Sequence, residues 1–121
     1  MSALCWFEIP CTDFDRATAF YEAVFDAPLQ LEDIGDGARK SIFLHDGAPQ
    51  GAVSWGADWT PSVTGVLVYF DAAPDLQVVL DRVEAAGGLV VEPKQAVDAT
   101  SGYWGRFRDT EGNLIGVLSP Q

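Results

Sequence analysis

Glu8 and Arg106 are the leading candidates for chemistry in this sequence. Glu8 could act as a general base or bind a positively charged group, and Arg106 could stabilise a developing negative charge. The only histidine, His45, stands in a polar turn, where a histidine is most often exposed to solvent. Cys5 and Cys11 form no CxxC or Cys/His pattern, and Cys11 is expected to be a small core residue. The cysteines and the histidine therefore do not by themselves indicate a metal site.

The composition restricts the class of protein. A length of 121 residues with 48% hydrophobic content is sufficient for one domain with a hydrophobic core. The 18 acidic and 7 basic residues give a net charge of −11, which argues against nucleic-acid binding. This acidity can serve solubility alone or attract a cationic ligand. No apolar run approaches the roughly 20 residues of a membrane helix, and no signal peptide is apparent. A cytoplasmic protein that does not act at membranes, with reduced cysteines, is therefore expected.

Hydrophobic periodicity predicts the order βαβββ twice along the chain. The first half is expected to contain a strand over 5–11, a helix that begins after Thr12 or Asp13 and ends near Asp26, and strands over Leu29–Asp33, Arg39–His45 and Gln50–Trp55. A turn over Gly35–Gly37 separates the first two of those later strands. The second half is expected to contain a strand over Val66–Phe70, a helix between Pro74-Asp75 and Gly87-Gly88, strands over Leu89–Glu92, Trp104–Arg108 and Leu114–Leu118, and a loop over Pro93–Gly102. We therefore predict an α+β domain of two modules, about 1–57 and 64–121, joined by a linker of about 58–63.

Three segments resemble the vicinal oxygen chelate superfamily, which contains glyoxalase I, extradiol dioxygenases, fosfomycin-resistance enzymes and bleomycin-resistance proteins. They are the first strand and helix, Glu8-Ile-Pro-Cys-Thr-Asp-Phe-Asp-Arg-Ala-Thr-Ala-Phe-Tyr21, the helix end Ala85-Ala-Gly-Gly88, and the last hairpin, Arg106-Phe-Arg-Asp-Thr-Glu-Gly-Asn-Leu-Ile115. The resemblance covers essentially the whole chain. It implies that the paired modules form a curved mixed sheet around a cup, usually within a homodimer.

The resemblance also assigns four strand positions to metal ligands, which are usually His, Glu or Gln. One position lies seven residues before the Asp that opens the first helix, and here it is Trp6. The position four residues after the turn glycine is Gly116 in the second module and, by the repeat, Gly51 in the first. The remaining position falls within Val66–Val68. None of these side chains can bind a metal, so no metal cofactor is expected, and neither are the metal-dependent reactions of the family. A displaced site built from Glu8 and His45 is the alternative.

If Phe7, Ile9 and Cys11 face the helices, alternation directs Trp6 and Glu8 into the implied cup. By the same argument we expect Val53 and Trp55 to face the cup, as do Leu114, Gly116 and Leu118. Trp104, Arg106 and Arg108 are expected on one face of their strand, with Gly105 and Phe107 on the other. The candidate ligand-binding residues are therefore Trp6, Glu8, Trp55, Trp104 and Arg106. The tryptophans could equally belong to the core or to a dimer interface.

Glu8 requires a partner if it is removed from water, and we expect Arg106 first and Lys40 second. Such a pair could simply join the two modules. Alternatively, Glu8 could anchor a ligand or act as a general base, and burial would then raise its pKa. The loop over 98–102 could be an ordinary hairpin loop or a mobile flap.

Three functions follow from these expectations. The first is a metal-free protein that binds a small cationic or aromatic molecule between tryptophan rings, as bleomycin-resistance proteins do. The second is a metal-independent lyase or isomerase that uses Glu8 as acid/base and Arg106 to stabilise negative charge. The third is an interaction module whose cup is filled by its own side chains. We favour the first, with a small molecule and a second copy of the chain as partners, and without a cofactor.

Overall fold

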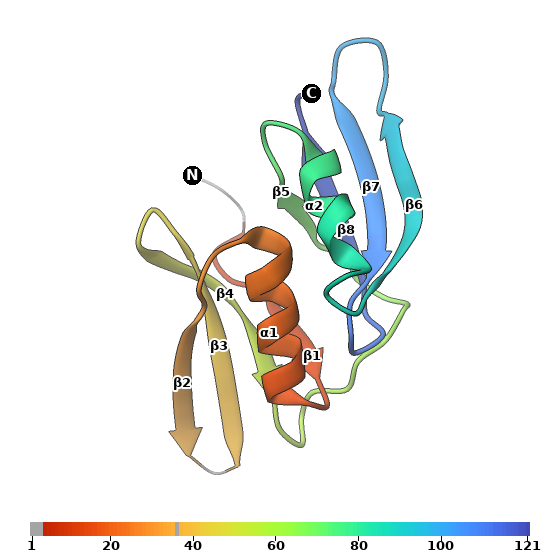
Figure 1. Ribbon diagram of the computed structural model, residues 1–121. Helices are drawn as coiled ribbons and strands as arrows, with labels where there is room; N and C mark the ends of the chain where they lie inside the picture. The colour runs from red at the N-terminus through yellow and green to blue at the C-terminus, as the bar shows by residue number, and fades with distance from the viewer. Residues whose placement is uncertain (1–3, 36) are drawn as a thin grey trace.

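A computed structural model describes residues 4–35 and 37–121, which form two halves with the same order of elements (Figure 1). The first half contains β1 (Glu8–Cys11), α1 (Phe14–Phe25), β2 (Gln30–Gly35), β3 (Ala38–His45) and β4 (Ala48–Trp55). The second contains β5 (Tyr69–Asp71), α2 (Leu76–Val83), β6 (Leu89–Ala96), β7 (Tyr103–Arg108) and β8 (Leu114–Ser119). The predicted tandem βαβββ fold is confirmed. Residues 1–3, at the start of the segment inspected for a signal peptide, and Asp36, in the predicted turn, lie outside the described residues.

Each half forms its own four-stranded mixed sheet. The strand orders are β1-β4-β3-β2 and β5-β8-β7-β6, and only the β1–β4 and β5–β8 pairs are parallel. The expected curved sheet is therefore divided into two hydrogen-bonded units. In Figure 1, α1 lies over the first sheet and α2 over the second, and the two helices contact each other. We call the face of each sheet that points away from these helices the outer face, because it corresponds to the surface expected to line the cup.

The hydrophobic core lies between the helices and the sheets and is continuous across both halves. The helices bury an amphipathic face, and every second residue of the inner strands points toward them. An aromatic group at its centre consists of Phe7, Tyr21, Phe25, Phe43 and Phe70, with contacting rings 4.6–6.3 Å apart between centroids. Ile9 and Cys11 are buried and Phe7 packs against the core, which confirms that these three side chains face the helices. The two halves therefore share one core.

The ends of the elements follow from local hydrogen bonding. Asp13 caps α1 by accepting the backbone N–H of Arg16 at 3.0 Å, and Asp75 caps α2 by accepting that of Gln77 at 2.9 Å. Asp26 ends α1 in the left-handed conformation. In the part of the chain that the structure describes, no helix is long and apolar enough to cross a membrane.

Two strands differ from their predicted bounds. β6 continues through Pro93 to Ala96, where we expected a loop from Pro93 onward. This strand is at the edge of its sheet, so the missing N–H of Pro93 can face away from the neighbouring strand. β5 begins only at Tyr69, so the connection between the halves is longer than the predicted linker.

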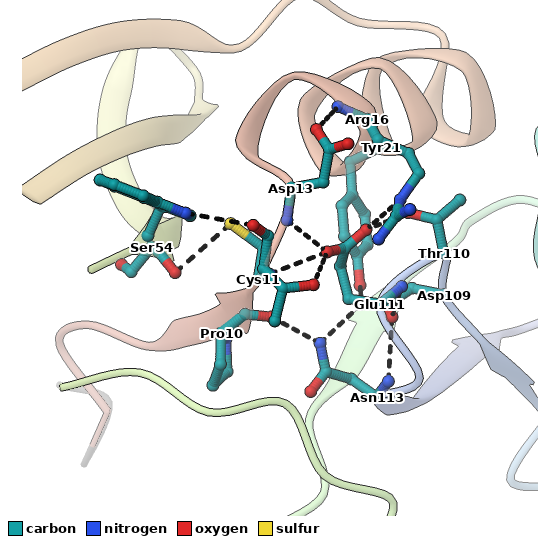
Figure 2. Close-up of polar contacts among 12 residues, drawn as sticks. Pro10, Cys11, Asp13, Arg16, Tyr21, Ser54, Asp109, Thr110, Glu111 and Asn113 are labelled. Carbon is teal, nitrogen blue, oxygen red and sulfur yellow. Dashed lines mark hydrogen bonds and ion pairs between the residues drawn. The ribbon is translucent and has the colours of Figure 1, made fainter. Parts of the chain in front are cut away.

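A polar network joins the start of α1 to the turn between β7 and β8 (Figure 2). At its centre is Glu111, whose side chain is fully buried. One carboxylate oxygen accepts the backbone N–H groups of Thr12 and Asp13, both at 2.8 Å, and the Thr12 hydroxyl at 3.0 Å. The other accepts Arg16 Nε at 2.8 Å and the Thr110 hydroxyl at 3.0 Å. A residue of the second half thus satisfies donors at the beginning of the first helix.

Asp109 extends this network into the core. We call the hydrogen-bonded group around Glu111, Asp109 and Asn113 the junction network. Its carboxylate accepts the Tyr21 hydroxyl at 2.6 Å and the backbone N–H groups of Glu111 and Asn113, each at 2.9 Å. Asn113 Nδ2 in turn donates to the Pro10 carbonyl at 2.7 Å. Burial and the negative charge of Asp109 raise the pKa of Tyr21, so Tyr21 remains a hydrogen-bond donor. The polar turn over 109–113 therefore has a structural role between the halves.

Candidate functional site

The sheet register identifies which residues of the two halves are equivalent. Gly116 donates its parallel-strand hydrogen bond to the Val68 carbonyl, and Ala52 donates the same bond to the Phe7 carbonyl. Ala52, and not Gly51, is therefore the counterpart of Gly116. The prediction of Gly51 is wrong because the β3–β4 register shifts between Phe43 and Leu44, which places an additional residue in β4 after the turn.

The absence of a side chain at Gly116 has a packing reason. A Cβ atom at this position would collide with the ring of Tyr69, which lies directly against the glycine from the neighbouring strand. Tyr69 therefore occupies space on the outer face that a longer side chain at 116 would require. Gly51 is crowded in the same way by Phe7, but on the face toward the core.

This packing predicts the result of a single substitution. Gly116→Ala should destabilise the fold by about 2 kcal/mol, because overpacking forces neighbouring groups to move. The free energy of unfolding from urea titration measures this effect. In a Tyr69→Ala background the same Gly116→Ala substitution should cost almost nothing. An equal cost in both backgrounds would contradict the proposed collision.

The residues at the four family ligand positions do not fit a metal ion. With the corrected register these positions hold Trp6, Ala52, Leu67 and Gly116, none of which offers a donor side chain suited to a divalent ion. Within residues 4–35 and 37–121, no three or more His, Cys, Asp and Glu side chains cluster closely enough to bind one. The alternative pair, Glu8 and His45, is engaged elsewhere: Glu8 binds the side chains of β3 and β4 described next, and His45 contacts the exposed Asp46.

Glu8 lies on the outer face of the first sheet, as predicted, but its partner is Lys40. The Lys40 ammonium and the Ser54 hydroxyl both donate to the same Glu8 oxygen, the latter at 2.6 Å, and Lys40 also donates to Ser54 at 2.9 Å. The Lys40 ammonium lies 4.3 Å from the centre of the Trp59 ring, which comes from the connection between the halves. The expected Glu8–Arg106 pair is absent from the described residues, because Arg106 has other partners.

These contacts do not prepare Glu8 to act as a general base. Burial alone would raise the pKa of Glu8, but the hydrogen bonds from Lys40 and Ser54 and the Lys40 charge outweigh it and hold the pKa below its ordinary value. A smaller contribution from the exposed Trp6 lowers this pKa further. The expected upward shift is therefore wrong. A carboxylate that is stabilised in its ionised form and already paired with a cation is a weak proton acceptor.

We predicted that Val53 and Trp55 face the cup, which corresponds to the outer face, and this prediction is wrong. Val53 is completely buried in the core, and alternation places Trp55 on the same, helix-facing side of β4. The Trp55 indole N–H donates to the Thr12 carbonyl at 3.1 Å, next to the start of α1. Trp55 is therefore separated from Glu8 by the sheet itself.

Arg106 and Trp104 lie on the outer face of the second sheet, opposite the buried Phe107, as predicted. The Arg106 guanidinium carbon is 4.7 Å from the centre of the Trp104 ring and 5.8 Å from that of Tyr69. Arg106 Nε donates to the Tyr69 hydroxyl at 2.8 Å. Sequence reasoning missed Tyr69, although a tyrosine in the otherwise apolar run Val66–Phe70 is a visible signal.

A pocket of about 200 Å³ lies where the two sheets meet. Its walls come from β1, from the connection between the halves and from the start of β8, and include Glu8, Pro10, Ser62, Val68, Asn113 and Leu114. Asn113 belongs to the junction network, and its side-chain oxygen accepts the Ser62 N–H at 3.1 Å, so the network also supports this pocket. Its walls are part apolar and part polar, as in small-molecule sites.

The remaining sequence candidates have ordinary structural roles. His45 is exposed, and its Nε2 lies 3.5 Å from a carboxylate oxygen of its neighbour Asp46. In the loop between β6 and β7, the Asp98 carboxylate accepts the backbone N–H groups of Thr100 and Ser101, which makes this an ordinary hairpin loop.

Comparison with known proteins gives one family and many similar folds. The model of the Glyoxalase/Bleomycin resistance protein/Dioxygenase superfamily matches residues 3–117. No curated protein matches this sequence. Among solved structures, a glyoxylase/bleomycin resistance protein/dioxygenase domain from Frankia sp. EAN1pec is similar with a TM-score of 0.73 and 18% identity, covering 100% of this chain and 99% of the other.

Two further structures have comparable similarity. A glyoxalase/bleomycin resistance protein from Albidiferax ferrireducens T118 has a TM-score of 0.71 and 20% identity, covering 99% of this chain and 100% of the other. The genomically encoded fosfomycin resistance protein FosX from Listeria monocytogenes, in its hexagonal crystal form, has a TM-score of 0.72 and 16% identity, covering 100% and 95%. At these identities the structures support the fold alone.

Proposed function

This chain belongs to the Glyoxalase/Bleomycin resistance protein/Dioxygenase superfamily, and from that premise we propose that it is a metal-free protein that binds a small aromatic molecule on its outer face. The observation that carries this proposal is that Arg106 contacts the rings of both Trp104 and Tyr69. Arg106 lies opposite Gly116, the position at which metal-binding members of the family would carry a ligand, and the Tyr69 ring fills the space beside this glycine. Aromatic walls with one polar anchor are typical of small-molecule sites.

Binding without chemistry is supported by the groups that this face offers. The carboxylate closest to the pocket, Glu8, is held ionised by Lys40 and Ser54. A nucleophilic role for Ser54 has no support, because the residue is completely buried and donates its hydroxyl proton to Glu8.

The proposal can be tested by thermal shift of metal-stripped protein. A small aromatic ligand at about one hundred times its Kd should stabilise the fold by about 2.7 kcal/mol, and Tm should rise accordingly. Ni²⁺, Zn²⁺ and Fe²⁺ should produce no saturable shift, because the four family ligand positions carry no suitable donors. Tryptophan fluorescence should report the same titration, because Trp104 borders the proposed site.

Two results would count against this function. A saturable response to one of the metals, lost on adding a chelator, would indicate a metal site that the fold does not reveal. Failure of every aromatic compound to shift Tm or fluorescence at millimolar concentration would contradict the binding function itself.

A further inference from the structure

We infer that the molecule bound on the outer face is an aromatic carboxylate, whose negative group is held by Arg106. This inference rests on the proposed binding function and specifies the chemical class of the ligand. It reverses the sign expected from the overall acidity of the chain, which suggested a cationic ligand. The reason is local, and it comes from the way the basic side chains are paired.

Four of the seven basic residues are already paired with carboxylates: Arg16 with Glu111, Arg39 with Asp15, Lys40 with Glu8, and Lys94 with Asp75. In the described part of the chain, Arg82, Arg106 and Arg108 have no carboxylate oxygen within 4.0 Å. Alternation along β7 places both Arg106 and Arg108 on the outer face, on either side of the buried Phe107. This part of the outer face therefore carries two arginines without ion-pair partners, beside the carboxylate of Glu92, in a protein of net charge −11.

The hydrogen bonding of Arg106 leaves its two terminal guanidinium nitrogens available for a ligand. Only Nε is used, by the Tyr69 hydroxyl at 2.8 Å, and among the described residues no acceptor meets the two terminal nitrogens. This bond and the Trp104 ring restrict the orientation of the guanidinium. Less side-chain entropy is therefore lost when a ligand binds. Two parallel N–H groups in a fixed plane match the two oxygens of a carboxylate.

A neighbouring carboxylate does not already fill this role. Glu92 lies opposite Arg106 in the β6–β7 register, but its oxygen accepts the Gln95 amide at 3.2 Å and no ion pair with Arg106 forms. On the first sheet, the carboxylate of Glu8 is compensated by Lys40. A cationic ligand would thus meet an unpaired arginine on the second sheet and a carboxylate that already has its counter-ion on the first. An anionic ligand can pair with Arg106, beside Glu92, which forms no ion pair with this arginine.

The size of the nearby pocket favours a ligand with a single ring system. Leu114, which lines the 200 Å³ pocket, is directly opposite Arg108 in the β7–β8 register. A cavity of about 150 Å³ is sufficient for a benzene ring. Arg106, Tyr69 and Trp104 do not themselves line this pocket. Its apolar walls can receive the ring of a ligand whose carboxylate is held by Arg106, next to the Tyr69 and Trp104 rings.

The test compares ligands that share a ring and differ only in charge. Isothermal titration calorimetry would measure phenylacetate, phenylacetamide and 2-phenylethylamine, and then indole-3-acetate, indole-3-acetamide and tryptamine. We expect each carboxylate to bind about tenfold more tightly than its amide, and the amines to bind more weakly still. Arg106→Gln should abolish the preference for the carboxylate and leave the affinity for the amide nearly unchanged. Arg82→Gln, which removes an arginine of α2 that has no carboxylate partner among the described residues, is the matched control and should keep the preference.

The outcomes separate this inference from the function on which it rests. Amides or amines that bind the wild-type protein as tightly as the carboxylates would overturn the inference and keep the binding function. The same holds for a carboxylate preference that survives Arg106→Gln. If no compound of either series binds, the binding function itself fails. The comparison within the wild-type protein needs no variant, so a folding defect of Arg106→Gln would not obscure the result.

Discussion

Replacing Glu111 with alanine should lower the stability of this protein by about 3 kcal/mol, which corresponds to a decrease in Tm of about 10 °C for a domain of this size. The buried carboxylate accepts five hydrogen bonds, two of them from the backbone at the start of α1. Without it, these donors and the Arg16 guanidinium lose their acceptor. Differential scanning calorimetry at neutral pH measures the change.

A matched control is Glu84→Ala, at the C-terminal end of α2, where the glutamate side chain is exposed. This variant removes the same charge and should change Tm by only about 1 °C, as expected for an exposed surface position. If Glu111→Ala and Glu84→Ala had similar effects, the hydrogen bonds of Glu111 would contribute no net stability, and the central role of the junction network would be wrong.

The second large effect is expected in acid. The hydrogen bonds to Glu111 lower its pKa from 4.5 to about 2, although burial alone would raise it. A carboxylate with a lowered pKa in the folded state stabilises the fold fully above the unfolded pKa, near 4.5. That contribution is lost as the pH falls toward 2, and the difference of about 2.5 pKa units corresponds to about 3 kcal/mol.

Urea titrations at several pH values between about 5 and 2 would show this loss in the wild-type protein. Glu111→Gln cannot titrate at this position, so it should be less stable near pH 5 but should show a shallower decline toward pH 2. Parallel curves for the two proteins would mean that other carboxylates cause the acid sensitivity. The comparison isolates one group in a chain with 18 acidic residues.

Much of the fold could be predicted from the sequence because short sequence patterns determine the order of elements in each half. Apolar alternation, the capping residues Asp13 and Asp75, and the two polar turns all indicate the same order of elements. Pro93 misled the prediction of β6, because proline is excluded from central strands but tolerated at an edge. Edge position is a property of the assembled sheet and cannot be read from a segment in isolation.

The site was less predictable because it depends on register and strand order. One additional residue in β4 moved the counterpart of Gly116 from Gly51 to Ala52 and reversed the direction expected for Trp55. Glu8 pairs with Lys40 because β4 lies between β1 and β3 and carries Ser54 to a position where it touches both. Sequence spacing alone does not reveal which strand will be the neighbour.

The contact between Glu111 and Thr12 also determines how the chain can fold. Its partners are 99 residues apart, so it forms only after almost the whole chain has been brought together, at a considerable cost in loop-closure entropy. Its stabilisation is therefore absent from either half alone, and α1 lacks these acceptors until the β7–β8 turn is in place. Although the sequence has the form of a duplication, the two halves are expected to unfold in a single cooperative transition.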